Sequence, residues 1–285
     1  GANTVAAQMA DWYARAFLRP NPKTAINEFA ESTAIPNMVL LVAGSVRGGL
    51  HMGKSAAHAD YLTGPSIASD LATAGAMLQC AQEGVMISSP TVLKTIAAAD
   101  CILIDEGSAD WTINGNAEPL AERLRQSGFR EVILISHKPS EQITAIARHI
   151  GANLCLGQLT ASDKIELIRQ RQLFGNKVVY VGDSNHGAPV ADAADVSIVV
   201  APETHIPDYH VILRQPDLEK LITLREIASQ SSKNEQVSMK TSLAFNVAGT
   251  FAALFLAMPI VGMAVVTNLG TIFNYRRAAK SLART

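Results

Sequence analysis

The sequence predicts an α/β fold in which a parallel sheet carries helices on both faces, joined to membrane-associated α-helices that include a C-terminal hairpin. From residue 86 onward, short runs rich in β-branched residues alternate with helix-like stretches, and this alternation favours a parallel sheet covered on both sides. Nearer the C-terminus, residues 241–275 contain no charged side chain, which predicts helices in contact with lipid.

Each element of the sheet domain has its own signal. The predicted strands are apolar and rich in Val and Ile, at residues 101–105, 131–136, 177–181 and 196–200. The predicted helices lie between and after them, at residues 117–127, 139–150, 162–173 and 188–194. Gly128 and Gly151 stand where two of these helices would end, because glycine readily adopts the left-handed conformation found just after many helices.

Residues 1–83 are predicted to form a helical, membrane-associated region. The apolar stretch 34–46 is shorter than the roughly 18–20 residues that cross a bilayer. Residues 61–82 are also apolar but contain Asp70, and a central carboxylate costs about 2.5–3.5 kcal/mol on insertion scales. The pattern leaves open whether residues 34–82 cross the membrane.

Residues 233–285 are predicted to form a transmembrane hairpin. As one helix, the uncharged run 241–275 would be about 52 Å long, against a hydrocarbon core of about 30 Å, and Pro259 stands in its middle. Basic residues flank both ends of the run, and such residues favour the cytoplasmic side, so both ends are expected there. The alternative is an apolar hairpin in the core of a soluble protein.

Composition narrows the class of protein. The chain of 285 residues is 48% hydrophobic and 17% charged, a balance typical of membrane attachment. Its net charge of −1 gives no reason to expect a nucleic-acid partner, since such partners usually require a clustered basic surface. The three cysteines form no CxxC pair and indicate reduced, mostly buried thiols; they are Cys80, Cys101 and Cys155.

Polar residues follow the predicted strands of the central domain, residues 84–232. Asp105 ends one strand, Ser136 ends another, Asp183 follows a third, and Lys164 begins a helix before that third strand. Ligands bind at the carboxyl ends of the strands in an open α/β sheet. These residue types suit phosphoryl transfer, since one carboxylate can attack phosphorus, a second can help to hold Mg²⁺, and a hydroxyl and an ammonium can neutralise phosphate oxygens. The alternative is that both aspartates simply end strands or cap helices.

Several segments resemble the heavy-metal class of P-type ATPases. Residues 178–189, VVYVGDSNHGAP, resemble the family's hinge pattern Gly-Asp-Gly-x-Asn-Asp-x-Pro, and ADAADVSIVV continues the likeness. Residues 84–105 resemble the approach to the family's phosphorylated aspartate, and residues 161–164 resemble its Asp-Lys segment. The resemblance implies a haloacid-dehalogenase-like (HAD) Rossmannoid domain, an aspartyl phosphate at Asp105, and Mg²⁺ held by Asp105 and Asp183.

The sequence departs from the family pattern at each reactive segment. The family's Asp-Lys-Thr-Gly-Thr reads Asp105-Glu106-Gly107-Ser108-Ala109 here, so an acid replaces the lysine. Its Thr-Gly-Asp reads Ser136-His137-Lys138, which exchanges a carboxylate for a cation, and its Asn-Asp pair reads His186-Gly187. With these changes Mg²⁺ can still bind Asp105, the Gly107 carbonyl and Asp183, but more weakly. His186 is more typical of an exposed loop histidine than of a new catalytic base.

Larger departures concern whole domains and the metal path. Residues 107–130 suffice for a loop and one helix, not for the nucleotide-binding domain that the family inserts there, so no ATP site is expected. We also expect no actuator domain within the 285 residues. The family's Cys-Pro-Cys-like motif corresponds to Tyr61-Leu62-Thr63, which offers no thiolate pair to a soft metal.

These departures favour a pseudo-P-type ATPase with a structural, assembly or regulatory role in a membrane complex. Asp105, Ser136 and Lys164 would then be vestigial or weak catalytic residues, and the sequence does not decide whether the chain is an enzyme. The expected setting is the cell (inner) membrane, with the HAD-like domain on the cytoplasmic side and with the lipid bilayer and partner subunits around the helices. Two alternatives stay open: a Mg-dependent HAD-type phosphohydrolase, and part of a split or remnant heavy-metal cation pump.

Overall fold

The computed structural model of the chain describes residues 25–106, 118–182, 188–201 and 209–282. The chain divides into two compact units. Of the described residues, the first unit takes those within 76–230, and the second unit takes 25–75 and 231–282. Two helices, α4 (Thr63–Gln82) and α10 (Lys220–Phe255), contribute residues to both units.

The first unit is built on a sheet whose described strands number seven, in the order β1-β7-β6-β5-β2-β3-β4. The strands are β1 (Val85–Ile87), β2 (Cys101–Asp105), β3 (Glu131–Ile135), β4 (Leu154–Leu156), β5 (Val178–Gly182), β6 (Val196–Val200) and β7 (Val211–Leu213). Neighbouring strands pair in parallel except β1 and β7, which are antiparallel. Because β2 lies between β3 and β5, the carboxyl ends of these three strands meet at one edge of the sheet.

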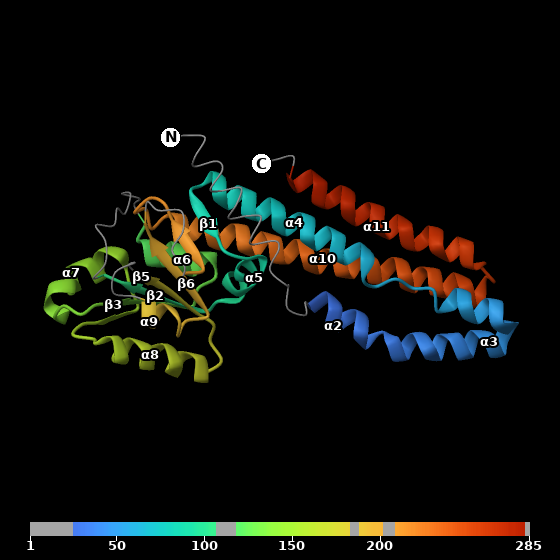
Figure 1. Cartoon of the computed structure of the whole chain (residues 1–285), viewed down its shortest axis with the longest axis horizontal. Coiled ribbons are helices and arrows are strands. Elements are labelled where there is room, and N and C mark those ends of the chain that lie inside the picture. Colours follow the sequence, from blue (N-terminus) through green and yellow to red (C-terminus); the bar gives the residue numbers. More distant parts are fainter. Residues whose placement is uncertain (1–24, 107–117, 183–187, 202–208, 283–285) are drawn as a thin grey trace. The chain divides into compact units, whose positions relative to one another are not determined.

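Helices cover both faces of this sheet (Figure 1). On one face lie α5 (Pro90–Ala98), α6 (Leu120–Ser127), α7 (Ser140–Ile150) and the first turns of α10. On the other face lie α8 (Ala161–Leu173) and α9 (Ala188–Ala191). The two-residue period of a strand divides the β2 side chains between them: Ile102 and Ile104 join the first core, and Leu103 joins the second.

The predicted α/β fold with flanking helices is therefore confirmed. The strands at 101–105 and 196–200 have the predicted bounds, β3 ends one residue before its predicted end, and β5 is shifted by one residue at both ends. Gly128 and Gly151 do follow helix ends, with φ of 120° and 72°. The strands β1, β4 and β7 were not predicted, because a run of three residues is too short to show a period.

The second unit is helical. Besides parts of α4 and α10, it contains α2 (Ala25–Ser32), α3 (Ala34–Ala56) and α11 (Ile260–Leu282). The predicted C-terminal hairpin is present, since α10 ends at Phe255 and α11 begins directly after Pro259. The Ser55 hydroxyl donates a hydrogen bond of 2.7 Å to the Met258 carbonyl and so ties the hairpin turn to α3.

One helical stretch among the described residues, Ile26–Ala56, is long and apolar enough to cross a membrane. This stretch overlaps residues 34–82, for which the sequence pattern did not decide whether the chain crosses the membrane. The two legs of the C-terminal hairpin offer only 15 and 16 uncharged residues, 241–255 and 260–275, which is short for a bilayer. Inside α3 the helix is interrupted at Gly49, whose φ of 80° suits a residue without a side chain.

The second unit has polar side chains inside and apolar side chains outside. The buried Asn246 side chain donates a hydrogen bond to the Asp60 carbonyl at 2.8 Å, and the buried Asn274 side chain donates to the Ser238 carbonyl at 3.1 Å and to the Ser242 hydroxyl at 3.0 Å. Large apolar side chains are exposed along α3, α10 and α11, among them Val46, Phe251 and Val261. This polarity is the reverse of the usual soluble arrangement.

Candidate functional site

The Asp105 carboxylate lies at the carboxyl end of β2 and is only 4% exposed. Its Oδ2 atom accepts a hydrogen bond from the Lys164 ammonium at 2.5 Å and another from the Tyr180 hydroxyl at 2.9 Å. All three side chains are buried, so water competes little for these contacts. A carboxylate taken out of water needs such donors, because an unpaired buried charge is costly.

Lys164 is positioned by the start of α8. Thr160 caps this helix: its hydroxyl accepts a hydrogen bond from the Asp163 N–H at 3.2 Å, and the Asp163 carboxylate accepts one from the Thr160 N–H at 2.8 Å. This reciprocal capping box fixes where the first turn begins. Lys164 is thereby held in the first turn of α8, on the side that faces the sheet.

A second polar network begins at the next residue, Glu106. The Ser136 hydroxyl donates a hydrogen bond to Glu106 Oε2 at 3.0 Å, and the Lys138 ammonium donates to Glu106 Oε1 at 2.9 Å. Ser136 is fully buried after the end of β3, and its Oγ also accepts a hydrogen bond from the Lys138 N–H at 3.0 Å. Both oxygens of the Glu106 carboxylate are therefore held by groups from the β3 end.

Glu106 and Lys138 change the sequence interpretation of two departures. In the P-type ATPase pattern that the sequence resembles, a lysine stands at the position of Glu106 and an aspartate at the position of Lys138. In this chain the charges are exchanged, and the two side chains form an ion pair of 2.9 Å. The two substitutions are therefore complementary in charge, and in this chain the two side chains pair with each other.

The structure brings together some of the residues predicted for the site. Asp105 and Lys164 are in direct contact, and Ser136 lies at the same edge of the sheet, bonded to Glu106. Gly107 and Asp183 lie outside the described residues. The catalytic and metal-binding roles assigned from the sequence stay predictions.

Sequence reasoning missed Tyr180. It lies on β5 in direct register with Leu103, its side chain is 1% exposed, and its hydroxyl reaches Asp105. Gly182 makes room for it, since a Cβ at position 182 would lie 2.4 Å from the Tyr180 hydroxyl oxygen. The available signal was a tyrosine in an otherwise apolar buried strand, because a buried tyrosine hydroxyl usually has a hydrogen-bond partner.

The described residues contain only part of the predicted Mg²⁺ site. Magnesium requires several oxygen ligands in octahedral geometry. Asp105 is the one predicted ligand within the described residues, and its Oδ2 atom already accepts a hydrogen bond from the Lys164 ammonium at 2.5 Å. Among the described residues no three His, Cys, Asp or Glu side chains gather in a way that could hold a metal ion.

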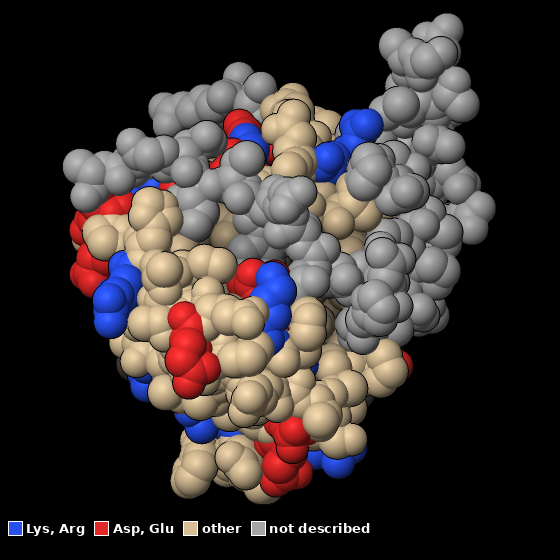
Figure 2. Space-filling model, turned by 90° about the vertical axis from the view of Figure 1, so that its left-hand side faces the viewer, with Lys and Arg blue, Asp and Glu red and all other residues tan. Residues whose placement is uncertain are grey.

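One end face of the chain is shown in Figure 2. Over its described part, Lys and Arg side chains are interspersed with Asp and Glu side chains rather than gathered by sign. A polyanion such as a nucleic acid binds through clustered basic residues. The described part of this face shows no such cluster.

Comparison with known proteins relates the chain to cation-transporting ATPases. No family model matches. The chain is 25% identical over 178 residues to the manganese-exporting P-type ATPase of Mycobacterium leprae, covering 61% of this chain and 25% of that protein. It is 33% identical over 168 residues to the potassium-transporting ATPase ATP-binding subunit of Agrobacterium fabrum, covering 57% of this chain and 24% of that protein.

Further matches point the same way. The zinc-exporting P-type ATPase of Mycobacterium marinum is 23% identical over 180 residues, which cover 62% of this chain and 25% of that protein. A crystal structure of a zinc-transporting PIB-type ATPase in the E2.Pi state superposes with a TM-score of 0.72 at 12% identity, covering 98% of this chain and 67% of that one. The chain spans about a quarter of the length of the curated relatives it matches. Through its HAD-like domain, the chain is a relative of the heavy-metal P-type ATPases.

Proposed function

We propose that the chain is a catalytically inactive, membrane-anchored relative of the P-type ATPases, a pseudo-ATPase with a structural, assembly or regulatory role in a membrane complex. The observation that carries the proposal is the internal pairing of the site. Lys164 and Tyr180 both hold one oxygen of Asp105, and Glu106 holds both Ser136 and Lys138. The groups that would contact a phosphate are bonded to each other instead.

The Glu106 carboxylate argues most directly against phosphoryl transfer. Phosphoryl groups are negatively charged, and enzymes that move them place cations and hydrogen-bond donors around them. A unit negative charge about 4 Å from the Glu106 carboxylate would meet a repulsion of about 4 kcal/mol at an effective dielectric constant near 20. Ser136 and Lys138 are the groups that would favour a phosphate. The Ser136 hydroxyl already donates its hydrogen bond to the Glu106 carboxylate, and the Lys138 charge is already paired with it.

The connection between β2 and β3 supports the absence of an ATP domain. Only residues 106–130 join the two strands, and α6 takes 120–127 of them. A nucleotide-binding domain of ordinary size needs at least about 50 residues. The proposal therefore includes no ATP site in this connection.

The inverted polarity of the second unit supports a membrane setting. Val46 is 84% exposed and Val261 is 70% exposed, whereas Asn246 and Asn274 are buried and hydrogen-bonded. Extended exposed apolar surface marks an interaction with lipid or with another protein. Because basic residues flank the hairpin, we place the HAD-like domain on the cytoplasmic side of the cell (inner) membrane.

The proposal is tested by turnover of the full chain in lipid nanodiscs. ATP hydrolysis and hydrolysis of a panel of phosphate esters are measured with Mg²⁺, with and without Mn²⁺ or Zn²⁺. We expect the chain and its Asp105→Asn variant to give the same background rate. Turnover that is lost in Asp105→Asn would refute the proposal.

A Mg-dependent phosphohydrolase is the second candidate, favoured because Asp105, Lys164 and Ser136 lie at the same edge of the sheet. Ester hydrolysis that requires Asp105, without ATP hydrolysis, would identify it. The remnant-pump alternative draws on relatives that export manganese and zinc. It would require metal-stimulated ATP hydrolysis that appears only with a partner supplying the missing domains.

A further inference from the structure

A cavity of about 410 Å³ opens at the junction of four elements of the first unit. It lies where α4 ends and β1 begins, and where β7 ends and α10 begins. Gly84 turns the chain there with a φ of 77°, and its carbonyl accepts a hydrogen bond from the Arg214 N–H at 3.0 Å. The two chain segments around the cavity are thereby joined at their backbones.

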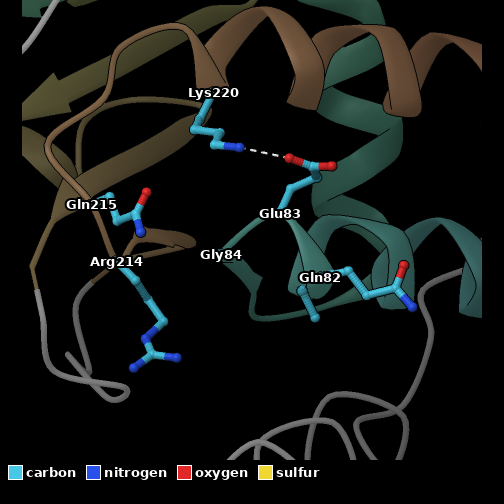
Figure 3. A pocket seen from close by; sticks show the side chains of 7 residues that line it. Gln82, Glu83, Gly84, Arg214, Gln215 and Lys220 are labelled. Carbon is cyan, nitrogen blue, oxygen red and sulfur yellow. Dashed lines mark hydrogen bonds and ion pairs between the residues drawn. The ribbon is translucent and has the colours of Figure 1, made fainter.

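The charges around this cavity are unbalanced. Figure 3 shows the Lys220 ammonium paired with the Glu83 carboxylate on one side, at 2.6 Å, and Arg214 and Gln215 extending from the β7 side. Two cations and one carboxylate leave a net charge of +1 in the lining. With Lys220 paired to Glu83, the guanidinium of Arg214 carries the excess.

Arg214 has a buried donor that needs an acceptor. Its Nε atom is buried and has no hydrogen-bond partner within the described part of the chain. Leaving a buried charged donor unpaired costs about 1–3 kcal/mol or more, so such groups usually bind something. The guanidinium fork matches the spacing of two oxygens on a carboxylate or phosphate group.

Amide groups complete the cavity. Gln82 at the end of α4 and Gln215 after β7 both line it, and both are exposed enough to turn toward a ligand. Each carries two N–H donors and one acceptor, which suits the outer oxygens of an anion. A metal cation is disfavoured, since two ammonium or guanidinium groups line the space and the one carboxylate is already paired.

We propose that this cavity binds a small oxyanion, the phosphate or carboxylate group of a metabolite, with Arg214 as the anchoring residue. The proposal is independent of whether Asp105 reacts. An occupied site would add contacts at the end of α4 and the start of α10 together, so ligand binding would reduce local opening of both segments.

The test uses the full chain in detergent at constant ionic strength, with inorganic phosphate and malonate as probes. Peptide-resolved hydrogen exchange is followed over residues 81–84 and 214–220, and affinity is measured by calorimetry. We expect at least one probe to bind and to protect both segments. Arg214→Gln should weaken that binding about tenfold or more, whereas the control Arg130→Gln, whose side chain is 84% exposed, should not change it.

Glu83→Gln gives the opposite expectation. It removes the negative charge of the lining and frees Lys220, so binding should become tighter, a result that misfolding does not produce. Protection by phosphate alone assigns a phosphate-bearing ligand, and protection by malonate alone assigns a carboxylate-bearing one. The proposal is overturned if neither probe protects these segments, or if Arg214→Gln binds as tightly as the unchanged chain.

Discussion

Removing the Lys164 ammonium tests how the fold keeps the Asp105 carboxylate buried. The two side chains are 10% and 6% exposed and lie 2.5 Å apart. At an effective dielectric constant near 20, two unit charges at that distance attract with about 7 kcal/mol, and desolvation offsets much of this. Lys164→Met removes the ammonium and keeps the hydrogen bond from the Tyr180 hydroxyl to the carboxylate. We expect the free energy of unfolding of the HAD-like domain to fall by about 3–5 kcal/mol.

A double-mutant cycle separates this pairing from packing. Asp105→Asn alone strands the buried ammonium and should cost a similar amount. Asp105→Asn with Lys164→Met removes both charges, so the double variant should be more stable than either single variant by about 2 kcal/mol or more. Lys177→Met is the matched control, because Lys177 is 55% exposed in its ion pair with Asp195 and should cost no more than about 1 kcal/mol.

The readout is thiol labelling of Cys101 during urea unfolding of the full chain in detergent. Cys101 is fully buried in β2, the strand that carries Asp105, so it reports the opening of this domain and not of the helical unit. Additive losses in the double variant would refute the reasoning, since they would show that the two charges do not depend on each other.

Three further predictions concern single residues. Burial raises the pKa of the Cys101 thiol to about 12, so alkylation near pH 8 should modify the half-exposed Cys155 long before Cys101, and equal rates would contradict the buried strand. For Asp195, burial raises the pKa, but hydrogen bonds from Lys177 and the Val178 N–H help to lower it overall, below 3.8. The stabilising contribution of the Asp195 carboxylate should therefore be complete at neutral pH and vanish as pH falls through its depressed folded-state pKa. The urea midpoints of the unchanged chain and of Asp195→Asn should then converge only in strong acid. Convergence already at pH 6 would contradict this prediction. Gly151→Ala should cost about 1–2 kcal/mol in urea unfolding, because φ at this position is 72° and the added Cβ would lie 2.9 Å from Pro119; an unchanged midpoint would show that the helix end relaxes.

Much of the fold could be predicted because its signals are local. The strands β2 and β6 are mostly apolar and rich in Ile and Val, a composition typical of buried parallel strands. The ends of α6 and α7 are marked by Gly128 and Gly151, because glycine adopts the positive φ found at both positions without steric cost.

The polar contacts of the site could not be predicted to the same degree because they join distant residues. Glu106 contacts residues 30 and 32 positions away, and Tyr180 contacts Asp105 across 75 positions. Each departure from the family pattern therefore reads as a separate loss in the sequence. Only the fold shows that the acid at 106 and the cation at 138 compensate each other.

The most direct test of the central claim is a chemical readout at residue 105 itself. The full chain is incubated with Mg²⁺ and either ATP or acetyl phosphate, a donor that needs no nucleotide site, and is then reduced with borohydride, which converts an aspartyl phosphate to homoserine. If the pairing of Asp105 with Lys164 and Tyr180 excludes phosphoryl transfer, peptide mass spectrometry should find an unmodified aspartate at position 105 with either phosphate donor. Homoserine at position 105 would contradict it.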